Sequence, residues 1–207
     1  MRPKPRYHHT NLKQSLLDAA VDLLSEAGPQ GFTLREVARR AGVSHNAPYR
    51  HFKDKDDLVG AVAAEGFDRL TEAMKEAMKE GNSGVERLRL AGRGYVEFAI
   101  RRPQHLLAMF DAPAGDCLRP EYTAAGQRAF QVLLDAISDV QAEGGLPRGD
   151  PHGFAVAAWA AVHGLAKLAI SGRLPFNAAE TIEFTGFLSR ALIHGMANVH
   201  PPPPSAG

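Results

Sequence analysis

The sequence has almost no cysteine. Cys117 is the only cysteine among 207 residues, so the chain cannot close an intramolecular disulfide bond. Small secreted domains often rely on such bonds, whereas a reducing compartment keeps thiols free. The first residues are basic and polar, and no apolar segment typical of a secretory signal follows them directly. We therefore expect a cytoplasmic protein.

Sequence motifs of common enzymes and metal sites are also missing. The chain has nine histidines, but no Cys-x-x-Cys or His-Glu-x-x-His pattern that would bind zinc. His8 and His9 are adjacent rather than four residues apart, so they would not share a helix face. No phosphate-binding loop, nucleophile elbow or dinucleotide fingerprint is present. These absences predict a protein that is not an enzyme and needs no metal or cofactor.

Long apolar segments are scarce, with one exception. Between Gly153 and Ile170 the only charged residue is Lys167, and this length approaches that of a membrane-spanning helix. The segment is dominated by alanine, however, and His163 and Lys167 lie near its middle, where polar groups are costly in a bilayer. We interpret it as a helix buried in a protein interface and expect no membrane contact.

Charge of either sign is barely in excess. The formal net charge is +1, which alone does not indicate a protein that binds nucleic acid. The first 55 residues nevertheless hold ten Lys and Arg against five Asp and Glu, so the remainder of the chain carries −4. A basic first quarter attached to a mildly acidic remainder is the distribution that binding to a polyanion requires.

Helical periodicity, in contrast, is present along nearly the whole chain. Apolar residues recur with the spacing of α-helices, and the strict alternation typical of strands is almost absent. We therefore predict an all-α fold of about nine helices. Capping residues, glycines and prolines set the predicted limits, which are 11–27, 34–42, 45–52, 55–79, 85–101, 103–112, 119–143, 151–171 and 178–198.

The same pattern divides the chain into two domains and two ends. Pro3 and Pro5 disfavour a helix at the start of the chain, and a proline run closes it. We predict a flexible basic arm at 1–10 and a disordered tail at 199–207. Between them we predict an N-terminal domain at 11–58 and a second helical domain at 59–198.

The segment from Thr33 to Phe52 has the features of a helix-turn-helix. Thr33 and Glu36 have the spacing of a capping box at a helix start. Ala38 is small enough for two helices to cross closely, and Gly42 can adopt the positive φ of the turn between them. The apolar residues that would face a small core are Leu34, Val37, Ala41, Val43 and Phe52.

The polar side chains left outside this core are suited to DNA. On a short helix in the major groove, Arg50 can address guanine and Asn46 can pair with adenine. Hydroxyl groups, and a lysine at a helix N-terminus, suit phosphates instead, while His51 would hold a phosphate or cap the helix. The predicted DNA contacts are Thr33, Arg35, Ser44, His45, Asn46, Ala47, Tyr49, Arg50, His51 and Lys55.

These residues together resemble the DNA-binding domain of the TetR family of transcriptional regulators. The matching segments are 32–38, 41–44 and 49–58. One departure is Pro48, which stands where the family usually has an aliphatic residue; proline is tolerated in the first turn of a helix, where N–H groups are unpaired anyway. The resemblance implies a homodimer that binds double-stranded DNA at a palindromic operator.

The later helices carry aromatic and polar residues that can line a cavity in a helical bundle. For each residue alone, ordinary core packing is the alternative. The run Trp159–Gly164 resembles the Trp–His–Gly signature of a subgroup of TetR C-terminal domains, which implies an unidentified small-molecule effector. The predicted effector-binding residues are Tyr95, Phe98, His105, Met109, Phe110, Phe130, Trp159 and His163.

The last two predicted helices have the composition of dimerisation elements. Helix 151–171 is rich in alanine and glycine, which permits close helix approach. Helix 178–198 carries a narrow stripe of Ile182, Thr185, Leu188 and Leu192, which is widened by Phe184, Phe187, Ala191 and Met196. Two copies of each helix would form a four-helix bundle across a twofold axis.

Taken together, these patterns predict a transcriptional repressor that a small-molecule effector releases from its operator. One alternative is a small helical ligand-binding protein or enzyme whose DNA-binding head is vestigial; paired catalytic groups in a C-terminal cavity would favour it. Another is a regulator without an effector, which a cavity filled by side chains would favour.

Overall fold

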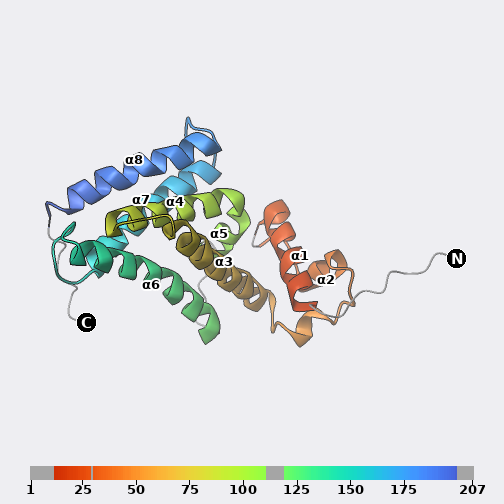
Figure 1. Ribbon diagram of the computed structural model, residues 1–207. Coiled ribbons are helices and arrows are strands. Elements are labelled where there is room, and N and C mark those ends of the chain that lie inside the picture. Colours follow the sequence, from red (N-terminus) through yellow and green to blue (C-terminus); the bar gives the residue numbers. More distant parts are fainter. Residues whose placement is uncertain (1–11, 29, 111–118, 200–207) are drawn as a thin grey trace. The chain divides into compact units, whose positions relative to one another are not determined.

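The structure is a computed structural model that describes residues 12–28, 30–110 and 119–199. Within these residues it is all-helical (Figure 1), which confirms the predicted fold class. The elements are α1 (Leu12–Ala27), α2 (Leu34–Arg40), the 3₁₀ helix η2 (Pro48–Arg50), α3 (Lys55–Met78), α4 (Gly84–Arg101), α5 (Pro103–Phe110), α6 (Pro120–Ala142), α7 (His152–Ile170) and α8 (Ala178–Met196).

Eight of the predicted helices begin and end within two residues of the observed α-helices. The exception is the helix predicted at 45–52, which is wrong as an α-helix: this segment forms turns and the three-residue η2. The predicted arm at 1–10 lies outside the described residues, as does the predicted tail except for Val199.

The chain divides into two compact units, which we call the head and the body. The head contains the described residues within 1–64 and 104–122, and the body those within 65–103 and 123–207. These units are not contiguous in the sequence, unlike the predicted domains 11–58 and 59–198. The reason is that Ala108 of α5 and Tyr122 of α6 lie in the hydrophobic core of the head.

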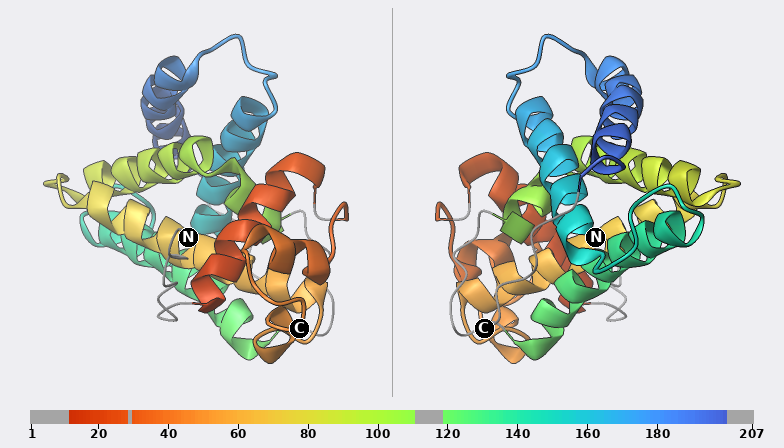
Figure 2. Two further views of the ribbon diagram at one scale, coloured as in Figure 1. Left: turned by 90° about the vertical axis from the view of Figure 1, so that its right-hand side faces the viewer. Right: turned by 90° about the vertical axis from the view of Figure 1, so that its left-hand side faces the viewer.

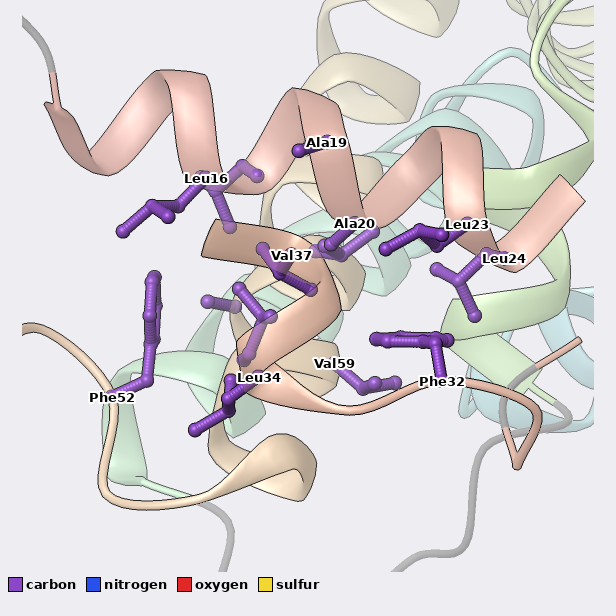
Figure 3. Close-up of a cluster of buried hydrophobic side chains, with 14 of the residues drawn as sticks. Leu16, Ala19, Ala20, Leu23, Leu24, Phe32, Leu34, Val37, Phe52 and Val59 are labelled. Carbon is purple, nitrogen blue, oxygen red and sulfur yellow. The ribbon is translucent and has the colours of Figure 1, made fainter. Parts of the chain in front are cut away.

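The core of the head is formed by the apolar stripe of α1 and the side chains that it covers (Figure 3). Leu16 and Ala20 of α1 lie over Val37 of α2, Leu24 lies over Phe32, and Phe52 reaches the same core from the segment after η2. Leu16, Val37 and Phe52 are each at most 1% exposed, and burying a side chain of this size stabilises a fold by about 1.5–3 kcal/mol.

Two glycines let the chain turn sharply around this core. Gly28 after α1 has φ +70°, and its N–H donates to the carbonyl of Leu24. Gly42 after α2 has φ +68°, and the following Val43 N–H donates to the Ala38 carbonyl. Glycine adopts such positive φ values without the steric cost that other residues incur. The turn predicted at Gly42 is therefore present.

In the body, α4, α7 and α8 pack against one another, and α7 and α8 (cyan to blue in Figure 2) lie side by side. A Cβ on Gly92 of α4 would lie 3.3 Å from Cγ1 of Val162 on α7, so this glycine permits the close approach. A second core cluster joins Leu88 of α4 to α6, α7 and α8 through Ile137, Phe154 and Ile193.

Candidate nucleic-acid interface and effector site

The segment 44–52, which we call the 44–52 turn, is the part of the head that sequence analysis expected to contact DNA. Hydrogen bonds between residues three apart shape its backbone: the Ala47 N–H donates to the Ser44 carbonyl, and the His51 N–H donates to the Pro48 carbonyl. Pro48 has no N–H with which to bond the Ser44 carbonyl in α-helical fashion. This missing donor explains why a 3₁₀ helix forms where an α-helix was predicted.

Pro48 and Phe52 hold the turn to the head, since both side chains are buried. Pro48 therefore occupies the inward position at which the resemblance led us to expect an aliphatic residue. The Ser44 hydroxyl accepts a hydrogen bond from the Asn46 N–H at 3.3 Å, which fixes the start of the turn. The exposed residues are Ser44, His45, Asn46, Tyr49 and Arg50, whereas Ala47 and His51 are half-buried.

The predicted phosphate contacts at helix starts already have protein partners. Thr33 and Glu36 form the predicted capping box of α2: the Thr33 hydroxyl accepts from the Glu36 N–H, and the Glu36 carboxylate accepts from the Thr33 N–H at 2.8 Å. Lys55 Nζ donates to Gln30 Oε1 at 3.0 Å and lies 5.9 Å from the centroid of the Phe32 ring. A phosphate at Lys55 would have to share the ammonium group with Gln30. Arg35 on α2 is exposed.

Arg40 links α1 to α2. Its Nη1 donates to Glu26 Oε1 at 2.8 Å, and the same guanidinium group lies 3.8 Å from a carboxylate oxygen of Asp22. The hydrogen bond raises the pKa of Arg40 and lowers that of Glu26 from their ordinary values. Arg40 therefore adds a surface ion pair between α1 and α2 to the apolar contacts of the core that joins them.

Sequence reasoning missed a polar cluster around Asp57, in the first turn of α3. Asp57 Oδ2 accepts from the Lys53 N–H at 2.8 Å and from Arg119 Nη2 at 2.6 Å, and Oδ1 accepts from the Tyr122 hydroxyl at 3.1 Å. Arg119 Nη2 also donates to the carbonyl of His51 at 3.3 Å. Burial, and next the negative charge of Asp57, raise the pKa of Tyr122 to about 12. Arg119 is 62 residues from Asp57 in sequence, so no local pattern could reveal this cluster.

Four of the predicted effector-binding residues meet in the body. The hydroxyl of Tyr95 on α4 lies 2.8 Å from Nδ1 of His163 on α7. The ring of Trp159 lies 6.1 Å from the rings of both His163 and Phe130, which is within the range of aromatic contacts. Burial raises the pKa of Tyr95 well above its ordinary value, so its hydroxyl stays protonated at physiological pH. We call Tyr95, Phe130, Trp159 and His163 the aromatic cluster.

The other predicted effector-binding residues are placed elsewhere. Phe98 is buried in α4 of the body. His105, Met109 and Phe110 belong to α5, which lies in the head, and His105 is buried there. The predicted set is therefore divided between the two units. Its sequence pattern could not reveal this, because aromatic residues at helical spacing pack into either core equally well.

The surface of α7 and α8 exposes apolar side chains. Val156 of α7 and Phe187 of α8 are each more than half exposed. The ring of Phe184 lies 5.1 Å from that of Phe176 and 5.5 Å from that of Phe187. Within the described residues, α7 is the one helix long and apolar enough to cross a membrane, and 28% of that stretch is buried inside the chain. Such an exposed apolar surface is typical of a protein interface.

Two residues of the predicted dimerisation surface, Thr185 and Met196, face inward instead, and Met196 lies in the second core cluster. Thr185 of α8 is fully buried within a single chain. Its hydroxyl donates to the Thr181 carbonyl one turn earlier at 3.0 Å, and this internal bond removes the cost of burying a polar group. The prediction that Thr185 and Met196 face a partner is therefore wrong.

Among the described residues, no group of three or more His, Cys, Asp or Glu side chains could hold a metal ion.

Comparisons with known proteins match two segments of the chain to one family. Residues 16–62 match the family described as "Bacterial regulatory proteins, tetR family", and residues 88–192 match "Tetracyclin repressor-like, C-terminal domain". The HTH-type transcriptional repressor Rv3405c of Mycobacterium tuberculosis is 48% identical over 48 residues, which are 23% of this chain and 26% of that protein. The match to this relative thus spans about a quarter of its length.

Solved structures extend the similarity to most of the chain. A protein of unknown function from Rhodococcus sp. RHA1 is 32% identical, with a TM-score of 0.80, over 94% of this chain and 100% of that one. AibR, solved in complex with isovaleryl coenzyme A and operator DNA, has a TM-score of 0.68 and 20% identity over 84% of this chain and 96% of AibR.

Proposed function

The chain belongs to the TetR family of DNA-binding transcriptional regulators, which are not enzymes, and from this premise we propose that it is a homodimeric repressor that a small-molecule effector releases from a palindromic operator. The observation that carries the proposal is the two-sided 44–52 turn. Its apolar side chains are buried in the head, and its polar ones are exposed. A folded protein that holds polar and basic side chains outward in this way can offer them to the edges of bases.

Within the turn, each exposed side chain has a proposed role. Arg50 and Asn46 have the donor groups that read guanine and adenine in the major groove, with His45 and Ala47 beside them. Tyr49, Ser44 and His51 supply hydroxyl and ring N–H groups for phosphates. Arg35, Thr33 and Lys55 would add phosphate contacts at the start of α2 and α3. A basic first quarter of the chain supports this assignment.

The exposed apolar surface of α7 and α8 supports the homodimer. A second copy would cover Val156, Phe184 and Phe187, which a single chain leaves in contact with water. A twofold axis through this surface would present two 44–52 turns to two half-sites, which accounts for a palindromic operator. The same function places the protein in the cytoplasm with the chromosome.

For the effector we propose the aromatic cluster as the binding region. It combines apolar rings with a hydroxyl and an imidazole, which is the mixture that orients a small molecule with a polar group. AibR was solved with an acyl-coenzyme A, so acyl-coenzyme A esters are the first class to test. The Trp–His–Gly subgroup stays a prediction, because the observed match is to the general tetracyclin repressor-like C-terminal domain.

The experiment begins with a pool of random DNA duplexes. The purified protein should enrich a palindromic sequence and bind it as two copies, measured by band shift and sedimentation. Acyl-coenzyme A esters of different chain length are then added to the complex, and one should dissociate it. Failure to enrich any sequence would contradict the DNA-binding assignment, whereas an ester that binds tightly without changing affinity for DNA would contradict release by an effector.

A further inference from the structure

We propose that Arg119 and Tyr122 are positioning residues for the 44–52 turn. Through Asp57 they fix the backbone at which the turn joins α3, and so hold the exposed side chains in the geometry that reads DNA. This inference rests on the proposed function of the turn. It assigns a role to residues at the start of α6, far from the helix-turn-helix in sequence.

The buried side chains of Pro48 and Phe52 attach the 44–52 turn to the head, but its backbone is not a regular α-helix. Pro48 removes one helical hydrogen bond, and η2 spans three residues, so few internal bonds fix its orientation. The segment between the turn and α3 is short and contains no helix. Bonds from outside the turn therefore add to Phe52 in fixing where it ends.

Asp57 supplies such bonds. Its side chain is 9% exposed, so water has little access to replace a lost partner. The carboxylate joins the Lys53 N–H, directly after the turn, to Arg119 and Tyr122. Charge-assisted hydrogen bonds of this kind are roughly twice as strong as neutral ones. Arg119 also donates a hydrogen bond directly to the carbonyl of His51. His51 is the residue of the turn that precedes Phe52.

Tyr122 is itself held in place by packing. It is 7% exposed and lies in the core of the head with Ala108. Its ring also lies 5.9 Å from the guanidinium carbon of Arg119, in the range of cation–π contacts. The buried ring of Tyr122 therefore positions both its own hydroxyl and the guanidinium group of Arg119. Asp57 accepts hydrogen bonds from these two groups and from the Lys53 N–H, and so links them to the end of the turn.

Removing the negative charge of Asp57 distinguishes a positioning role from a purely electrostatic effect on DNA binding, because the two change the affinity for DNA in opposite directions. Asp57→Asn removes a negative charge close to the DNA-binding surface, and electrostatics alone would strengthen binding to DNA. Loss of positioning would instead weaken binding to the selected duplex while leaving binding to unrelated DNA unchanged or stronger. Asp56→Asn is the matched control, since Asp56 is an exposed carboxylate of the same helix turn.

The test compares four proteins by band shift: wild type, Asp57→Asn, Asp56→Asn and Tyr122→Phe. The probes are the duplex that the wild type selects from a random pool and a scrambled duplex of equal composition. We expect the ratio of specific to non-specific affinity to fall about tenfold for Asp57→Asn and about threefold to tenfold for Tyr122→Phe. Asp56→Asn should retain the wild-type ratio.

Tyr122→Phe keeps the buried ring and removes only the hydroxyl, so it should remain folded, which circular dichroism checks. Hydrogen–deuterium exchange of the peptide covering 44–58 should become faster in both Asp57→Asn and Tyr122→Phe. The positioning role is overturned if wild type selects a duplex but both variants keep its specificity ratio and exchange rates. If wild type selects no duplex, the proposed function fails instead, so the two failures are distinguishable.

Discussion

Tyr49 and Phe52 are three residues apart and have opposite environments, so replacing each by alanine tests the orientation of the 44–52 turn. Phe52 is 1% exposed and packs in the core of the head, whereas Tyr49 is 54% exposed. Removing a buried phenylalanine side chain lowers the free energy of unfolding by about 3–5 kcal/mol. A substitution at an exposed site usually changes it by about 0.5 kcal/mol or less.

Thermal unfolding followed by circular dichroism measures the difference. For a domain of roughly 60–100 residues, each 1 kcal/mol shifts Tm by about 4–8 °C. We therefore expect the transition of the head to fall by more than about 10 °C in Phe52→Ala and to stay nearly unchanged in Tyr49→Ala. Phe52→Leu, which keeps a large apolar side chain, should lose only about 1 kcal/mol.

Binding to the selected duplex should show the complementary pattern. Tyr49→Ala should bind about fivefold more weakly at a temperature where it is fully folded, because one phosphate hydrogen bond of about 1 kcal/mol is lost. Equal losses of stability in the two alanine variants would refute the orientation of the turn. So would an unchanged affinity in Tyr49→Ala combined with wild-type stability in Phe52→Ala.

Three further predictions concern the DNA contacts and the aromatic cluster. Arg50→Ala should weaken binding by roughly 1–3 kcal/mol and relax the preference at one base position; repeating the duplex selection checks this, and an unchanged consensus would remove Arg50 from base recognition. Affinity for the selected duplex should fall on the order of a thousandfold between about 50 and 200 mM salt if the dimer contacts several phosphates, and a flat titration would argue against them. Tyr95→Phe should lower the free energy of unfolding by about 1 kcal/mol, since it removes the hydrogen bond to His163, and should weaken the response to the effector; a variant with the wild-type response would exclude the hydroxyl from effector binding.

Most of the fold could be predicted from the sequence because the helix limits have local causes. The capping box of Thr33 and Glu36 starts α2, and Gly28 and Gly42 end α1 and α2 with positive φ. Each of these features acts within a few residues of the element that it limits. The same is true of the apolar stripe of α1, whose buried residues follow the helical period.

The errors have local and non-local causes. An α-helix was predicted at 45–52 because proline is tolerated in a first turn, but Pro48 lies so close to the centre of a short segment that only a 3₁₀ helix remains. Thr185 was placed on the outer face of α8 because its internal hydrogen bond to Thr181 was not anticipated. The packing of α5 in the head depends on tertiary contacts such as those of Ala108. The periodicity of the sequence does not reveal such contacts.

In the candidate site too, local features were predictable from the sequence and contacts between distant residues were not. The polar residues of the 44–52 turn were predicted because one short segment holds them all, and the structure leaves five of them exposed. The cluster around Asp57 was not predicted, since Arg119 and Tyr122 lie 62 and 65 residues from Asp57 in the chain. Similarly, Tyr95 and His163 are separated by 68 residues, and only the packing of α4 against α7 brings them together.

A crystal structure of the protein with its selected duplex would show whether the 44–52 turn lies against the bases. We expect two copies of the chain, each with residues 44–50 in a major groove, and the two grooves separated by one helical turn of DNA, ~34 Å, or a multiple of it. A complex in which this segment faces away from the DNA, or in which one copy binds alone, would contradict this expectation.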